Sequence, residues 1–282
     1  MASSLFPDGV CVIACSGPSL NEVDCSTLGI PVIAISTAIR TLKRPNYWAL
    51  ADTLNALHGD EGKDAWKDPS IMKVVPRNKN TKLKTGHHPD FIMVDCQQSN
   101  RSNCNVALEL FDPNLPYLRG PHKTVLMALQ WAHCNGANNI IFAGNDLFAS
   151  SLEAKYSYTS NAADLKKKHN FLKTLDQVDT CMFNWYPHAK RKGFEWYSWK
   201  CGSAFDKMSV KFDPSMLDSL KKTNIDPPKP MVIVSPSVRD VPLEQITNVP
   251  APLEKLPKSD MLRRRAKFKG ISNKAMSRFY GK

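Results

Sequence analysis

Short apolar runs alternate with polar and amphipathic stretches over the first 144 residues of the chain. Residues 10–15 and 30–36 are almost wholly apolar, as expected for strands that are buried on both faces of a sheet. Residues 124–134 carry apolar side chains at helical spacing, and Gly136 follows them as a residue that commonly ends a helix. We predict further strands at 47–51, 71–75, 91–94 and 139–144, and a second helix at 164–176. Strands that alternate with helices predict a doubly wound, mostly parallel α/β sheet.

The composition changes near residue 224. Eight prolines fall between Pro227 and Pro257, which favours an extended strap over residues 225–258. Residues 255–282 contain ten Lys or Arg and one Asp, so they carry nine of the twelve net positive charges of the 282-residue chain. We therefore expect one folded domain over residues 1–224, a proline-rich strap over 225–258 and a basic tail over 259–282. Such a tail suits DNA or an anionic membrane surface.

Several protein classes are excluded by the composition. The longest apolar runs are far shorter than the roughly 20 residues that span a bilayer, and the first ten residues lack the features of a secretory signal. The eight cysteines include no Cys-x-x-Cys pair, so a zinc finger or zinc ribbon is not expected. We expect all eight cysteines to be reduced, and the protein to be soluble and cytoplasmic.

Three short motifs carry candidate chemistry. Ser16-Gly17-Pro18-Ser19 directly follows the first predicted strand, where a glycine turn and a helix start can present backbone N–H groups to a phosphate. The other two are Arg119-Gly120-Pro121-His122-Lys123-Thr124, ahead of the helix at 124–134, and Gly144-Asn145-Asp146, at the end of the strand at 139–144. Each segment is also compatible with a plain turn that binds no ligand.

Together these motifs resemble those of the bacterial lipooligosaccharide sialyltransferases and of the wider Gly-Pro-Ser-Leu superfamily of Rossmann-like proteins. That superfamily includes archaeal pterin diphosphokinases and motility-associated glycosyltransferases. The resemblance rests on Ser16-Gly17-Pro18-Ser19-Leu20, on the strands that follow it up to residue 52 and on the stretch 124–148, about a quarter of the chain. It implies a Rossmann-like, GT-A-like single domain over residues 1–224 that binds a nucleotide sugar.

The resemblance also implies roles for individual residues. It assigns the nucleotide to Ser16, Gly17, Pro18, Ser19, Ser36, Asp52, Lys123, Thr124, Gly144 and Asn145. It places Asp146 at the ribose or base, and it makes Tyr156 and Tyr158 the donors of hydrogen bonds to the departing phosphate. Phenols can take this role without a metal, and the chain has no Asp-x-Asp metal clamp. We therefore expect no bound metal.

The chain departs from the sialyltransferases at the catalytic base. Those enzymes have a histidine where this chain has Thr159, and a threonine cannot act as a general base. The candidates for the base are His188, His169, Asp146 and Asp164. A different base indicates an acceptor other than the galactose of the sialyltransferases.

A segment rich in aromatic and basic residues is the candidate acceptor site. Seven of the seventeen residues from 183 to 199 are aromatic, and aromatic faces beside cations suit bases or sugar rings near phosphates. We assign the acceptor to Lys190, Arg191, Trp196, Trp199 and, in the tail, Arg263, Arg264 and Arg265. The alternative for the segment is a buried strand with a charged turn.

The sequence therefore predicts a metal-independent, inverting glycosyltransferase that moves a sugar from a nucleotide sugar to an acceptor hydroxyl. The basic tail favours a hydroxymethylated base in DNA as the acceptor, as in the modification of bacteriophage genomes. Three alternatives stay open: transfer to a surface glycan, a pterin-type diphosphokinase that needs ATP and Mg²⁺, and a non-catalytic protein that binds nucleotides or nucleic acid.

Overall fold

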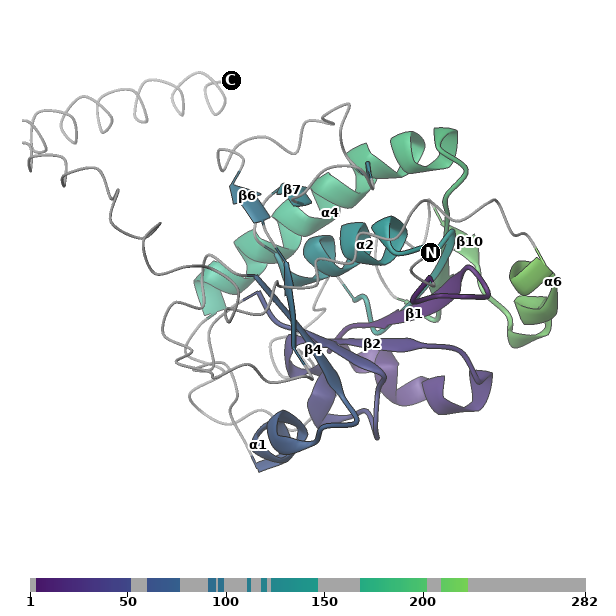
Figure 1. Ribbon diagram of the computed structural model, residues 1–282. Helices are drawn as coiled ribbons and strands as arrows, with labels where there is room; N and C mark the ends of the chain where they lie inside the picture. Colours follow the sequence, from purple (N-terminus) through teal and green to yellow (C-terminus); the bar gives the residue numbers. More distant parts are fainter. Residues whose placement is uncertain are drawn as a thin grey trace, which may run out of the picture. The chain divides into compact units, whose positions relative to one another are not determined.

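The computed structural model describes residues 4–51, 60–76, 91–94, 96–98, 111–112, 118–120, 123–146, 168–201 and 209–222. Its centre is a sheet of eight strands, every neighbouring pair of which is parallel (Figure 1). The strands are β1 (Val10–Ala14), β2 (Val32–Ile35), β3 (Tyr47–Ala49), β4 (Met72–Pro76), β5 (Phe91–Val94), β8 (Asn139–Ala143), β9 (Glu195–Trp199) and β10 (Val210–Lys211). Strands β6 (Cys96–Gln98) and β7 (Leu118–Gly120) form a separate parallel pair.

The strand order is β10-β9-β8-β1-β2-β3-β4-β5. From β1 the chain proceeds through β2 to β5 on one side, and β8 then returns to the other side of β1. The direction of winding therefore reverses between β1 and β8. This is the topological switch point of a Rossmann-like sheet, and the Rossmann-like, doubly wound α/β class that the sequence predicts is confirmed.

Helices cover both faces of the sheet. The α-helices are α1 (Asp60–Lys67), α2 (Thr124–Cys134), α4 (Lys168–Arg191) and α6 (Leu217–Lys222). Within the described residues they are accompanied by the 3-10 helices η1 (Pro18–Glu22), η2 (Cys25–Leu28), η3 (Ser36–Arg40) and η6 (Pro214–Met216). Helices α2 and α4 lie on one face (Figure 1), whereas α6 contributes Leu220 to the core of the other face.

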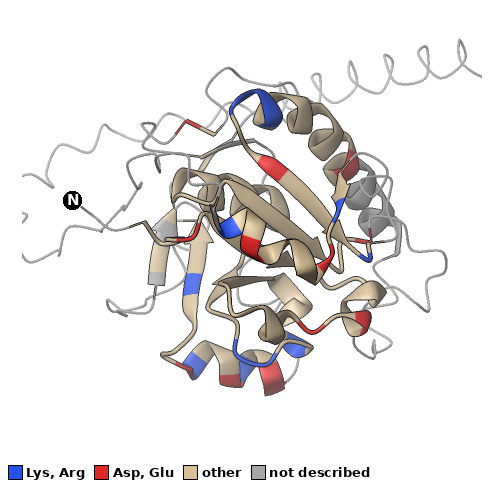
Figure 2. Ribbon diagram, turned by 90° about the vertical axis from the view of Figure 1, so that its right-hand side faces the viewer, with Lys and Arg blue, Asp and Glu red and all other residues tan. Residues whose placement is uncertain are grey.

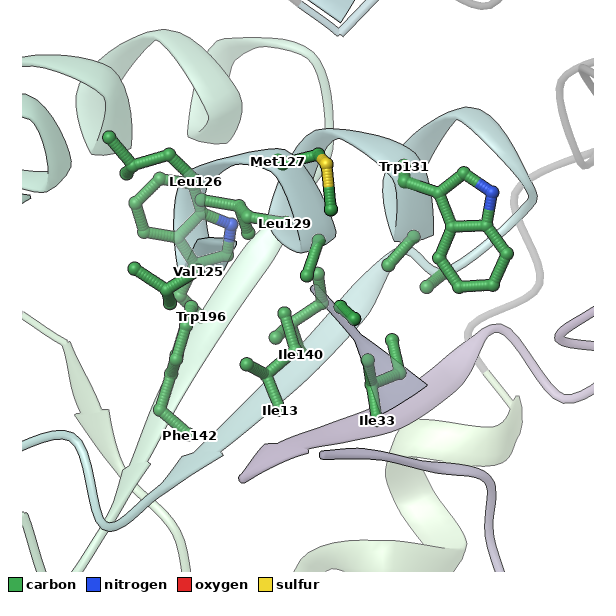
Figure 3. Packing of buried hydrophobic residues seen from close by; sticks show 14 of the residues in the cluster. Ile13, Ile33, Val125, Leu126, Met127, Leu129, Trp131, Ile140, Phe142 and Trp196 are labelled. Atoms are coloured by element: carbon green, nitrogen blue, oxygen red, sulfur yellow. The ribbon is translucent and has the colours of Figure 1, made fainter. Parts of the chain in front are cut away.

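The alternation of side chains along each strand divides the core in two. Ile13, Ile33 and Ile140 point toward α2 and pack against its apolar residues (Figure 3). Val12, Ile141 and their neighbours face the opposite side, where η1, η2 and α6 cover them. Burial on both faces is the reason that these strands are apolar at nearly every position.

The predicted strands and the helix at 124–134 are confirmed, with bounds that shift by one or two residues. The second predicted helix is longer, because α4 ends at Arg191 and includes Pro187. A proline removes a backbone N–H and clashes with the preceding turn, and this one lies in the last two turns of the helix, four residues before its end. The expectation that all eight cysteines are reduced is wrong at Cys181, which is disulfide-bonded.

Charges of both signs are interspersed on the folded part. Figure 2 shows Lys, Arg, Asp and Glu together on α1 and on the outer turns, while most of the sheet carries none. No described helix is long and apolar enough to cross a membrane. The chain divides into two compact units, residues 1–235 and 236–282, and the proposed strap and tail lie outside the described residues.

Candidate functional site

Two glycine turns meet at the carboxyl ends of β1 and β8. The backbone N–H of Gly17 donates to the carbonyl of Gly144 at 2.9 Å, and the N–H of Cys15 donates to the carbonyl of Ala143 at 2.8 Å. A Cβ added to Gly17 would lie 2.5 Å from the Gly144 carbonyl oxygen and 2.5 Å from Asp146 Oδ2. Gly144 itself has a φ of +62° and would place a Cβ 2.4 Å from the Cys15 carbonyl oxygen. Only glycine fits at either position.

Asp146 joins the second turn to the first. Its Oδ2 accepts a hydrogen bond of 2.7 Å from the backbone N–H of Ser19, 127 positions away along the chain. The N–H of Leu20 donates to the carbonyl of Gly17, and Pro18 has no N–H. The sequence-based expectation of free backbone donors at the start of a helix is therefore wrong, because η1 is a short 3-10 helix whose donors are already bonded.

The serines of the first turn offer hydroxyls instead. The Ser19 side chain is 7 % exposed, and its Oγ has no hydrogen-bond partner in the described structure. Ser16 is half-buried at the carboxyl end of β1. A buried hydroxyl without a partner is costly, and a bound polar ligand would remove that cost.

Ser36 and the start of α2 lie at the same carboxyl edge of the sheet, near the ends of β2 and β3. Ser36 directly follows β2 and has a φ of 48°, and its carbonyl accepts a hydrogen bond of 2.8 Å from the Trp48 indole N–H. Thr124 begins α2, and its Oγ1 accepts a hydrogen bond of 3.3 Å from the backbone N–H of Ala51, just beyond β3. The start of α2, including Lys123, is thus held at the carboxyl edge, as the nucleotide assignment requires. Asp52 lies outside the described residues.

Asn145 does not reach this edge with its side chain. It is 2 % exposed, and its amide donates to the sulfur of Met182 on α4 at 3.6 Å. The side chain of Asn145 is therefore not available to a nucleotide, because the amide is turned into the core under α4.

The residues at the end of α4 lie at the opposite edge of the sheet. Helix α4 ends at Arg191, and β9 begins four residues later at Glu195, which is paired with Asn139, the first residue of β8. Five residue steps along β8, about 16 Å, separate Asn139 at this amino edge from Gly144. His188, Lys190 and Arg191 therefore lie far from the β1–β8 turns, and the assignments of His188 as base and of the two cations to an acceptor beside those turns are corrected.

The side chains of these three residues make contacts with their own neighbours at the end of α4 and the start of β9. Lys190 Nζ lies 3.5 Å from Glu195 Oε2, and the Tyr186 hydroxyl donates to the same carboxylate. Arg191 Nη2 lies 3.4 Å from His188 Nδ1. Burial, with smaller contributions from Lys192 and Arg191, lowers the pKa of His188 below its ordinary value.

The two tryptophans of the predicted acceptor site are core residues. Trp196 is fully buried between β9 and α2, where its indole N–H donates to His133 Nε2 at 2.8 Å. Trp199 is 7 % exposed and packs edge-on against Phe212 at 5.4 Å. Neither ring has a face available for stacking, so the expectation is wrong and the alternative, a buried strand after a charged turn, is confirmed.

His133 is a buried residue that the sequence analysis did not single out. Because Trp196 donates to its Nε2, its Nδ1 carries the proton and donates to the Ala137 carbonyl. Burial lowers the pKa of His133 to about 3. The neutral ring stacks on Phe194 with 4.0 Å between the ring centroids. Together with the hydrogen bond from Trp196, this contact links α2 to β9.

Other sequence-based assignments are not tested by the structure. Tyr156, Tyr158, Arg263, Arg264 and Arg265 lie outside the described residues. Within the described ranges, no group of three or more His, Cys, Asp or Glu side chains is arranged to hold a metal ion.

The site therefore consists of two interlocked glycine turns, a carboxylate that ties them together, and hydroxyls beside them. The pairing of Asp146 with Ser19 is the feature that no local sequence signal gives, because it joins segments far apart in the chain. Comparisons with family models, curated proteins and solved structures found no match to this chain.

Proposed function

We propose that the chain binds a nucleotide sugar outside the carboxyl ends of β1 and β8 and transfers the sugar to an acceptor hydroxyl. The observation that carries the proposal is the reversal of winding at this point, flanked by the Gly17 and Gly144 turns. Ligands of open α/β sheets bind in the crevice outside the carboxyl ends at such a switch point. The GT-A-like character of the domain is part of the same proposal.

Hydroxyls and a helix start supply the proposed nucleotide contacts. Ser16 and Ser19 follow β1 and Ser36 follows β2, so they offer side-chain or backbone groups at two strand ends, and Thr124 begins the 11-residue helix α2 at the same edge. No acidic residue lies in the first turn of α2. The positive end of a helix favours a phosphate in its vicinity.

The proposed reaction is a single displacement with inversion. The acceptor oxygen forms a bond to the anomeric carbon, the bond from that carbon to the phosphate oxygen breaks, and a base takes the hydroxyl proton. Asp146 is the candidate base, because it is the ionisable side chain tied to the β1–β8 turns. Tyr156 and Tyr158 remain the proposed donors to the departing phosphate. No metal is part of the proposal.

The acceptor is proposed to be a hydroxymethylated base in DNA. Since the aromatic residues of β9 are buried, this proposal depends on the net charge of the tail and not on stacking. A surface glycan is the alternative acceptor, and the same basic tail would then hold the protein at an anionic membrane.

The test is a transfer assay with UDP-, GDP- and CMP-sugars, with and without hydroxymethylated DNA. We expect acceptor-dependent release of the nucleotide from one of these donors in the presence of a chelator. The Asp146→Asn variant retains an oxygen that can accept from Ser19, so it should bind the donor but lose about 10²- to 10⁴-fold in rate. Lys67→Ala, on the exposed end of α1, is the matched control and should keep full activity.

Other outcomes would identify another function. Binding of ATP with a strict requirement for Mg²⁺ would favour a diphosphotransferase. Binding of a nucleotide without turnover of any donor would favour a non-catalytic nucleotide-binding protein. Full activity of the Asp146→Asn variant would remove Asp146 as the base.

A further inference from the structure

We propose that a groove on the sheet face opposite α2 is a second ligand site, which binds a small amphipathic anion. The groove lies between the segments 20–26 and 41–46 and has a volume of about 790 Å³. This is within the range of roughly 300–1,000 Å³ that is typical of small-molecule sites. The inference does not depend on the proposed transfer reaction, because the groove contains none of the residues assigned to that reaction.

The groove exists because two connections of the sheet are made by short 3-10 helices. The connection from β1 to β2 uses η1 and η2, and the connection from β2 to β3 uses η3. In doubly wound folds such connections are usually α-helices that pack side by side over the sheet. Helices of only four or five residues leave the surface between them uncovered.

Four residues of the buried core form the floor of the groove, although the lining as a whole presents more polar than apolar surface. Leu20, Cys25, Ile30 and Val32 line it, and all four belong to the buried core of this face. Gly29, also on its wall, has open space around the position of a Cβ. A ring or a short hydrocarbon body would therefore find an apolar surface here.

The rim of the groove carries two exposed cations, of which Lys43 interacts electrostatically with Asp24 and Arg44 with Asp68. Lys43 and Arg44 are both exposed on the rim, and neither forms an ion pair within 4 Å in the described structure. The one carboxylate on the rim, Asp24, already accepts hydrogen bonds from the Ser26 N–H at 3.0 Å and the Ser26 hydroxyl at 2.6 Å. An apolar floor beneath an ammonium and a guanidinium fits a ligand with an apolar body and a phosphate or carboxylate group.

The test uses phenyl phosphate as the probe and amide NMR spectra of the full chain as the readout. We expect saturable shifts confined to the segments that line the groove, stronger than those caused by phenol or by inorganic phosphate. Benzoate in a parallel titration separates a site for phosphates from one for carboxylates, and either result supports the site.

The variants separate the charge contribution from a change in folding. Lys43→Ala combined with Arg44→Gly removes both cations, and glycine preserves the φ of 55° at position 44. We expect this double variant to weaken binding at least tenfold with an otherwise unchanged spectrum, whereas Lys67→Ala should bind as the wild type does. Absence of shifts, equal shifts with phenol, or unchanged affinity of the double variant would overturn the inference.

Discussion

Gly144 and Gly29 have the same backbone φ of +62° but very different surroundings. A Cβ at Gly144 would clash with the Cys15 carbonyl and with Leu20, while a Cβ at Gly29 would meet nothing within 4 Å. Gly29→Ala should therefore cost only the left-handed strain, about 1 kcal/mol. Gly144→Ala should cost at least about 2 kcal/mol more, because the β1–β8 turns must move apart. Urea unfolding of the two variants measures the difference, and equal losses would show that the turns are not tightly interlocked.

The buried His133 makes the stability of the fold depend on pH. Its pKa is about 3 when folded and about 6.5 when unfolded, so the unfolded chain binds the extra proton between these values. The neutral histidine contributes its full stability above pH 6.5, and this contribution is lost as the pH falls. We expect the free energy of unfolding to fall by about 1 kcal/mol between pH 6.5 and 5.5 from this residue.

The control is His133→Phe, which removes the titrating group. It should be less stable at pH 7.5, because the Trp196 indole N–H loses its acceptor, but its stability should change less with pH. The same pH slope in both proteins would contradict the assignment of the slope to His133.

At the scale of elements, Tyr47 of β3 packs against Trp131 of α2, and one hydroxyl ties the start of α2 to the chain just beyond β3. Thr124 Oγ1 accepts from the Ala51 N–H, and Ala51 is 2 % exposed. Thr124→Val keeps the shape but leaves this donor unpaired, so we expect a loss of about 1–3 kcal/mol in stability. Thr124→Ser keeps the hydroxyl and should lose less. Thermal unfolding compares the two variants, and a Thr124→Val protein as stable as the Thr124→Ser protein would contradict the role of this bond.

The elements that the sequence predicts well are those defined by their own burial. Strands β1, β2 and β8 are apolar at nearly every position because both faces are covered, and α2 ends at Cys134, two residues before Gly136. The prediction that the segment at 195–199 contains acceptor-binding tryptophans is wrong, because tryptophans are equally common in a binding face and in a core. Only its pairing with β8 and the contact of Trp196 with His133 show that it is buried.

The candidate site is predictable in part for a similar reason. The sequence places the Ser16–Ser19 turn and the Gly144–Asp146 turn at strand ends, and the parallel sheet brings strand ends to one edge. It does not reveal that Asp146 accepts from Ser19, that Asn145 turns toward Met182, or that His188 lies at the other edge. These outcomes depend on the order of the strands and on packing against α4, which no local pattern determines.

At the scale of the whole molecule, we expect the folded part to bind the nucleotide sugar and the tail to bind DNA, each without the other. Residues 259–282 contain eight Lys or Arg and one Asp, whereas charges of both signs are interspersed on α1. A chain that ends at residue 258 should keep its affinity for the nucleotide sugar and lose salt-dependent binding to DNA. Calorimetry with the nucleotide and gel shifts at low salt measure the two properties. Equal DNA binding with and without the tail would place the DNA contact elsewhere.

The most direct test of the account is to locate the nucleotide. Amide NMR spectra of the full chain are recorded during titration with UDP-, GDP- and CMP-sugars, alongside Gly17→Ala as a variant whose turn cannot close. The account predicts that one of these nucleotides causes saturable shifts at Ser16, Gly17 and Gly144, and that Gly17→Ala loses them. Shifts confined to other parts of the molecule, or no saturable shift with any of the three, would contradict a nucleotide site at the carboxyl ends of β1 and β8.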